Sequence, residues 1–541
     1  YGKISGETVI GGTFIMKKIV AITALLLVAV LALGSFAACD QKPDENTLTI
    51  EAVNLGFGLD WLYALGNAYS AKHPGIKVDI QPFVGQVGND TINGHSEATA
   101  GYTDIFVFRP TNYHFNAYQG AVNTSKGKID CLYADLTDIY TSPYEDGSTM
   151  ESKMDAKVAK FLQVNGKYYG VNWVDDFMGI VRNKDAWTKL GLTDNDIPVT
   201  TDEMFSLCDR ILAKNQGIAP FIYSKTEEYY TSIWDIWMSQ YEGEEKMGYF
   251  THGLNPVGEA DENLYSFTGQ KVALDMVNRL LEKTNKKYKY QHENSDSLTF
   301  TDMQSYFLEG QAALCVNGSW LEIEMNKSLS GKKNYNIDYI RMPVVSDLIK
   351  IPVVKDGGVN TDEKLAEVIR YVDATDSGDQ SAVKPEGVSE EAIARVREAR
   401  HFSYTRGGTD HTMVVAGWSE KIDLAKDFIK FMYSDEGMKV YYNAQGGMTL
   451  PAKLTSGNYD ALQLSTFTQS VVDAMKSAYY SELCFAKSAK VYCLGGVSFN
   501  FTNGSGNFVS EMLAGKTPDT IINANKTYLK QNWTTIANKC K

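Results

Sequence analysis

Cysteine is scarce in this sequence, with only seven in 541 residues, and no two of them form a C-x-x-C pair. Such sparse use in a long chain excludes a small disulfide-rich scaffold. One disulfide among the last three cysteines, Cys484, Cys493 and Cys540, stays open.

Basic residues are also in short supply, because 52 Lys and Arg face 66 Asp and Glu, for a net charge of −14. An acidic surface repels a phosphate backbone, so no nucleic-acid partner is expected.

The chain has no apolar run long enough to cross about 30 Å of hydrocarbon as a helix. Its longest run, from Ile19 to Leu33, follows Lys17 and Lys18 and precedes small residues, which is the pattern of an export signal over 16–38. Residues 1–15 carry no pattern and are interpreted as an upstream, non-native extension.

The signal ends in "SFAAC", which resembles a bacterial lipobox except that Phe36 replaces the usual Leu. In a lipobox the cysteine, here Cys39, is lipidated and becomes the first mature residue, so we expect a membrane anchor followed by a polar tether over 39–46. Ordinary cleavage, which would leave Cys39 as a free thiol, is the alternative.

Recognisable catalytic and cofactor motifs are missing as well. The "AGKT" at 514–517 has Ser510 where a phosphate-binding loop needs glycine, and neither H-E-x-x-H nor G-x-S-x-G occurs. We therefore expect no catalytic residue, no metal site and no cofactor.

What the sequence does contain is an alternation of strand and helix patterns. The stretches 47–53, 76–80 and 102–108 alternate or run apolar like strands, and 60–75 has apolar residues at helical spacing. This order predicts an α/β fold, and the chain length favours two lobes.

Four segments resemble the extracellular solute-binding proteins of ABC importers, in the carbohydrate-binding branch. They are "NGSW" after a helix, Gly and strand (317–320), "A-x-x-F-I-K-F-M-x-S-D-E-G" (425–437), "NGKYYGVNW" (165–173) and "LAGKTPDTI" (513–521). The resemblance implies two α/β lobes with mixed, mainly parallel sheets and a ligand cleft between them. It also implies a sugar ligand, ABC permease subunits as partners, and a monomer.

On this basis the lobes are expected to divide as follows: lobe 1 at 47–155 plus about 402–447, and lobe 2 at 156–345 plus about 448–541. The stretch 346–401 is charged and poor in aromatic residues, so it is interpreted as a helical, solvent-facing insertion.

Trp320 is the leading candidate for ligand contact, because it follows a strand and a Gly-Ser turn. Ligands of open α/β sheets bind beyond the carboxyl ends of strands, and an indole covers the apolar face of a sugar. The family's "N-G-x-W" Trp is a sugar-stacking residue, although a core Trp is the alternative from sequence alone.

Most further contacts are carried over from the resemblance, whereas Trp173 is an aromatic residue that this sequence adds to the family pattern. The second-lobe candidates are Trp173 and Asp176, with Asp175 as the near competitor, together with Glu228, Tyr230, Trp234 and Phe501. The first-lobe candidates are Asn54, Phe108, Arg109 and Asn112. Asp60 and Trp61 follow in the first strand-to-helix loop, and Trp61 is equally interpretable as a core residue.

Two other functions stay open. An exported glycoside hydrolase would use the same aromatics with two carboxylates about 5–9.5 Å apart, and Asp176 and Glu228 are the pair to nominate. A binding protein for a peptide, a polyamine or a metal chelate is the third class.

Overall fold

The computed structural model describes most of the chain after the N-terminal segment. The described residues are 44–54, 56–83, 103–108, 113–118, 120–124, 127–224, 229–328, 335–406, 411–445, 449–457, 462, 464–477, 479–481, 486, 488–498, 503 and 507–541. The expected extension, signal peptide and Cys39 lie outside them. A compact unit comprises 48–541.

The first sheet has five strands in the order β2-β1-β3-β16-β8. The strands are β1 (Thr47–Val53), β2 (Lys77–Phe83), β3 (Ile105–Phe108), β8 (Val171–Asn172) and β16 (Thr412–Val415). β1 and β3 run parallel, with Ile50 opposite Ile105, whereas β16 runs antiparallel to both β3 and β8. The strands predicted at 47–53, 76–80 and 102–108 are confirmed.

A first core forms around this sheet from buried residues between 48 and 174 and between 413 and 454. Its helices include α2 (Asp60–Lys72), α18 (Ile422–Met432) and α19 (Asp435–Gln445), and α2 packs against the other two. The shorter elements of this part are α4 (Tyr113–Tyr118), α5 (Thr137–Thr141), α6 (Met150–Lys153), α7 (Ala156–Leu162), and the hairpins β4 (Val122–Thr124) with β5 (Gly127–Ile129) and β6 (Gln163–Val164) with β7 (Lys167–Tyr168).

The second sheet has the strand order β10-β13-β9-β15-β17, with β14 also paired to β9. The strands are β9 (Phe177–Asn183), β10 (Ala219–Ile222), β13 (Ala312–Gly318), β14 (Ile337–Ile340), β15 (Phe402–Arg406) and β17 (Tyr479–Ser481). β9 pairs antiparallel with β13, β14 and β15, while β10 with β13 and β15 with β17 are parallel. Mixed sheets are thus confirmed. However, the pairs that β9 and β16 form with their neighbours are antiparallel, so parallel pairs do not predominate as expected. The physical reason is that both strands enter their sheets from connections between the lobes.

Buried residues cover both faces of the second sheet. In β13, Val316 belongs to a large second core and Cys315 to a smaller third cluster, as expected for neighbours that point to opposite faces of a strand. The helices of this part are α8 (Lys184–Lys189), α9 (Thr201–Ala213), α10 (Tyr230–Glu242), α11 (Glu244–Thr251), α12 (Thr268–Leu280), α13 (Phe300–Leu308), α14 (Leu321–Ser328), α20 (Thr466–Ser477), α21 (Lys490–Cys493), α22 (Phe508–Leu513) and α23 (Pro518–Lys539), with the turn η2 (Asp194–Asp196) and the hairpin β11 (Lys283–Thr284) with β12 (Lys287–Tyr288).

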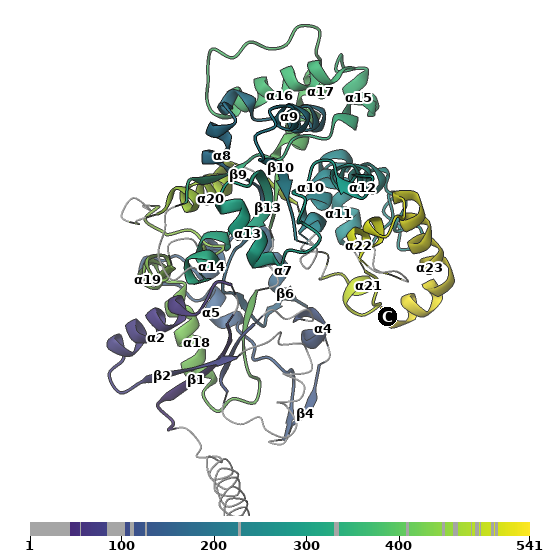
Figure 1. Cartoon of the computed structure of the whole chain (residues 1–541). Helices are drawn as coiled ribbons and strands as arrows, with labels where there is room; N and C mark the ends of the chain where they lie inside the picture. Colours follow the sequence, from purple (N-terminus) through teal and green to yellow (C-terminus); the bar gives the residue numbers. More distant parts are fainter. Residues whose placement is uncertain are drawn as a thin grey trace, which may run out of the picture. The chain divides into compact units, whose positions relative to one another are not determined.

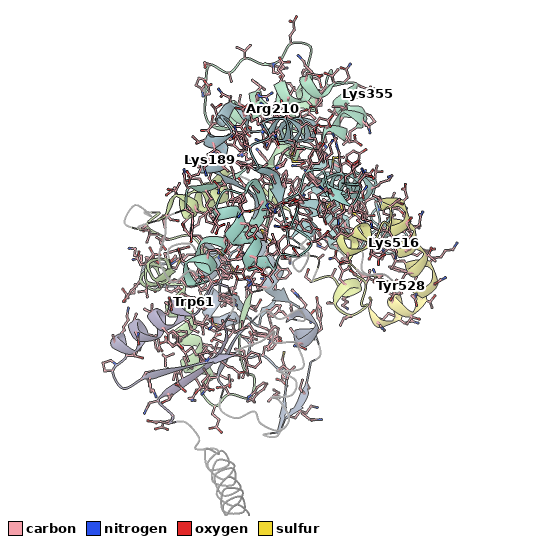
Figure 2. The ribbon with its side chains drawn as sticks, viewed as in Figure 1. Trp61, Lys189, Arg210, Lys355, Lys516 and Tyr528 are labelled. Atoms are coloured by element: carbon pink, nitrogen blue, oxygen red, sulfur yellow. The ribbon has the colours of Figure 1, made fainter. Side chains whose placement is uncertain are left out.

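The stretch 346–401 is helical, as predicted. It forms η3 (Ser346–Lys350), α15 (Pro352–Lys355), α16 (Asp362–Asp376) and α17 (Glu390–His401). These helices gather beside α9 in Figure 1, and Figure 2 labels Arg210 of α9 and Lys355 of α15 in this group. Their apolar faces are not solvent-facing, because side chains from Val354 to Ala399 belong to the second core.

The two cores divide the chain somewhat differently from the expected lobe boundaries. Residues 156–174 contribute buried side chains to the first core, and β15 pairs within the second sheet. The connections between the sheets therefore include the stretch from β8 to β9 and the stretch from β15 to β16. No helix in the described part of the chain is both long and apolar enough to span a membrane.

Candidate functional site at the junction of the two cores

Trp320 lies two residues after the end of β13, and the position of its indole depends on a glycine. A Cβ atom at Gly318 would overlap three carbon atoms of the six-membered ring of Trp320. The absence of a side chain at Gly318 therefore lets the indole lie back against the end of the strand.

Helix α14, which follows Trp320, lies between two hydrophobic clusters. Trp320 and Ile323 are partly buried against the first core, whereas Leu321 and Met325 are buried in the third cluster. Since residues three and four apart share a helix face, one face of α14 meets the first core and the other meets the second sheet. Trp320 therefore follows a strand of the second lobe in the sequence, but its indole packs against the core of the first lobe.

Aromatic rings from both lobes surround the indole. The ring centroids of Trp320 and Phe57, from the loop after β1, are 5.8 Å apart at an interplanar angle of 79°. The ring of Tyr229, at the start of α10, lies 5.9 Å from the indole at 65°. Edge-to-face contacts of this kind are favourable, and they place three aromatic rings at the junction.

Phe57 also contacts rings on its own side of the junction. Its centroid lies 6.0 Å from Trp173 and 5.9 Å from His411, both nearly perpendicular to it. Nδ1 of His411 lies 3.8 Å from Oδ1 of Asp176, and both side chains are buried.

Trp173 packs inside the first core. It is 1% exposed, its ring is parallel to that of Trp61 at 5.5 Å, and its Nε1 donates to the carbonyl oxygen of Phe108 at 2.9 Å. Trp61, labelled in Figure 2, comes from α2. The structure therefore gives Trp173, Trp61 and Phe108 packing roles, and a ligand contact by Trp173 or Phe108 stays a prediction.

Asp175 and Asp176 lie in the connection between β8 and β9, where both are buried. The backbone N–H of Asp175 donates to the carbonyl oxygen of Thr449 at 2.7 Å, and the Thr449 hydroxyl donates to the backbone carbonyl oxygen of Asp175 at 2.8 Å. Two segments far apart in sequence are thereby joined where the chain passes between the sheets.

Tyr230 and Trp234 are buried on α10. The Tyr230 ring stacks on Tyr223 at 5.5 Å, and burial raises the pKa of Tyr230 well above its usual value. Trp234 packs against Phe508 at 5.6 Å. Contact of either side chain with a ligand stays a prediction.

A small pocket adjoins the junction through Tyr229. It has room for about one water molecule, and it is lined by Tyr223, Ser224, Tyr229, Tyr230, Met303, Val316 and Val509.

Of the remaining predicted contacts, Asn54 is exposed at the end of β1. Arg109, Asn112, Glu228 and Phe501 lie outside the described residues. Phe57, Tyr229 and His411 are not among the contacts predicted from the sequence. The one available signal was that Phe57 lies in the loop directly after the first strand.

Two lobes with separate cores, and an aromatic junction between them beside the connecting segments, define the class of two-lobed solute-binding proteins. The profile described as "Bacterial extracellular solute-binding protein" matches residues 58–439, which is most of the chain, and the chain belongs to this family.

Solved structures support the fold. Apo RafE from Streptococcus pneumoniae superposes with a TM-score of 0.53 at 16% identity, covering 91% of this chain and 99% of that one. A chitin oligosaccharide binding protein gives 0.55 at 16% identity, covering 89% and 95%, and RafE in complex with raffinose gives 0.50 at 16% identity, covering 89% and 98%. No curated protein sequence matches the chain significantly.

Proposed function

We propose that this protein captures a sugar, in particular an oligosaccharide, between its two lobes and delivers it unaltered to the permease of an ABC importer. One observation carries the proposal: Trp320 of the second lobe meets Phe57 of the first and Tyr229 of its own lobe at the junction of the cores.

The chemistry of sugars fits this arrangement. A pyranose ring has an apolar C–H face that stacks on an aromatic ring, and its hydroxyls need polar partners near that ring. The similar folds of RafE, solved with raffinose, and of the chitin oligosaccharide binding protein favour a ligand of this class.

Family membership implies an extracellular location. We further propose that Cys39 carries a lipid that holds the protein at the outer face of the cell membrane, as a monomer. Replacing Cys39 with Ser should move the protein from the membrane fraction to the soluble fraction. Retention of the variant in the membrane would contradict the anchor.

A thermal-shift screen against mono- and oligosaccharides tests the function, since a ligand that binds only the folded state raises its melting temperature. Raffinose and chitotriose belong in the panel, and titration calorimetry then gives Kd for each sugar that shifts the transition. The same mixtures should show no new reducing ends over hours. Binding of peptides or polyamines with no sugar response would refute the proposal, and new reducing ends would establish a hydrolase.

A further inference from the structure

We infer that Glu324 is a specificity-determining residue of this site, which accepts hydrogen bonds from hydroxyls of the sugar ring that stacks on Trp320. The inference rests on the proposed function and names a residue that neither the sequence motifs nor the family resemblance singled out.

Trp320 directly precedes α14, and Glu324 lies one helical turn after it, on the same side of the helix. The backbone N–H of Glu324 donates to the carbonyl oxygen of Trp320 at 2.9 Å, as one turn of helix requires. Side chains four residues apart on a helix are neighbours, and this face is the one that meets the first core.

The carboxylate of Glu324 is held by a buried amide. Nε2 of Gln304 donates to Oε2 of Glu324 at 2.8 Å, and Gln304 is fully buried on α13. An anchored carboxylate binds with less loss of side-chain entropy than a free one, so Glu324 is prepared for a ligand.

The other carboxylate oxygen lies against the backbone of the first lobe. A Cβ atom at Gly56 would come within 2.8 Å of Oε1 and 3.2 Å of Cδ of Glu324. The next residue, Phe57, meets Trp320. Consecutive residues of one first-lobe loop therefore face the carboxylate of Glu324 in α14 and the indole of Trp320 just before it.

This pairing supplies both chemical requirements of a sugar ring. The indole covers the C–H face, and a carboxylate accepts charge-assisted hydrogen bonds from two neighbouring hydroxyls at the ring edge. A ring placed there also touches the first-lobe loop, so the interaction depends on both lobes.

Calorimetric titration of Glu324→Gln with raffinose and chitotriose tests the inference. Gln keeps the size of the side chain and removes the charge, and we expect at least about tenfold weaker binding of the sugar that wild type binds, with an unchanged melting temperature without sugar. Glu324→Asp keeps the charge but withdraws the carboxylate by one methylene, and it should also weaken binding.

The matched control is Glu309→Gln. Glu309 likewise accepts a hydrogen bond from a glutamine amide, Gln311 at 3.0 Å, but it is exposed at the end of α13. The sugar affinity of the Glu309→Gln variant should equal that of wild type. Unchanged affinity in both Glu324 variants, or an equal loss in the control, overturns the inference, whereas failure of wild type to bind any sugar refutes the proposed function itself.

Discussion

At the scale of single residues, Trp320 is the side chain on which sugar binding should depend most. Replacing Trp320 with Ala removes the stacking surface, while the indole is only partly buried and its neighbours Phe57 and Tyr229 remain. We expect at least about tenfold weaker sugar binding by calorimetry, which corresponds to about 1.4 kcal/mol.

Tyr63→Ala is the control for this change, because Tyr63 is a large aromatic residue that is 43% exposed on α2. It should leave the affinity unaltered. Wild-type affinity in Trp320→Ala would show that the indole serves packing alone.

The sequence located Trp320 correctly after a strand and a small-residue turn, because strand ends and glycine turns are local features. It could not separate Trp320 from Trp173 and Trp234, since burial depends on distant partners. Trp173 is enclosed by Trp61 and by the carbonyl of Phe108, and Trp234 by Phe508, which is 274 positions further along the numbering. No local sequence pattern predicts those contacts.

At the scale of elements, an ion pair ties α6 and α19 to the segment after Thr449. Nζ of Lys153, with a side chain only 4% exposed, donates to Oδ1 of Asp435 at 2.7 Å and to the carbonyl of Tyr433 at 2.8 Å. The backbone N–H groups of Thr455 and Ser456 donate to the same carboxylate. Burial opposes the charge on Asp435, but these bonds outweigh it and lower its pKa to about 2.

A lowered pKa means that Asp435 stabilises the fold at pH values above the ordinary aspartate pKa of about 4, and that this stability is lost as the pH falls toward 2. Asp435→Asn should lower the free energy of unfolding at pH 7 by about 2 kcal/mol. It should also flatten the decline of stability between pH 4 and 2. Urea unfolding at several pH values measures both, and Asp423→Asn, at an exposed position of α18, is the control. A parallel pH profile in Asp435→Asn would contradict the assignment.

The helices of 346–401 are structural parts of the second core. Ile369 of α16 is fully buried in that core, whereas Glu367 on the same helix is exposed and pairs with Lys364. Ile369→Ala should therefore destabilise the protein by about 2–5 kcal/mol in urea unfolding. Glu367→Ala should change stability by less than about 0.5 kcal/mol. A small loss of stability in Ile369→Ala would instead indicate that 346–401 is a peripheral insertion.

Helices and strands were largely predictable from sequence, since periodicity is local, but their pairing was not. β16 begins at Thr412, yet it lies between β3 and β8, and β15 joins the sheet of β9. Because the chain crosses between the sheets in this way, residues 156–174 pack in the first core, although we expected them in lobe 2. They also explain the antiparallel pairs that the resemblance did not lead us to expect.

At the scale of the whole molecule, the site joins two cores that otherwise meet through connecting segments and surface contacts. One surface contact is the ion pair between Lys157 of α7 and Glu244 of α11, at 3.2 Å with both side chains well exposed. Solvent screens such a pair, so it adds little to the union of the lobes. The contact of Phe57 with Trp320 is better shielded from water, and under the proposed function a bound sugar would couple the lobes there.

A sugar held by both lobes should therefore stabilise both cores together. At one hundred times Kd, binding to the native state alone adds about 2.7 kcal/mol to the free energy of unfolding. Urea unfolding with raffinose or chitotriose, whichever binds, should shift the transitions seen by tryptophan fluorescence and by far-ultraviolet circular dichroism by the same amount. In Trp320→Ala at the same sugar concentration both shifts should shrink together. A sugar-induced shift confined to one part of a biphasic transition would mean that the ligand lies within a single lobe, because stabilisation by mass action reaches only the cooperative unit that binds.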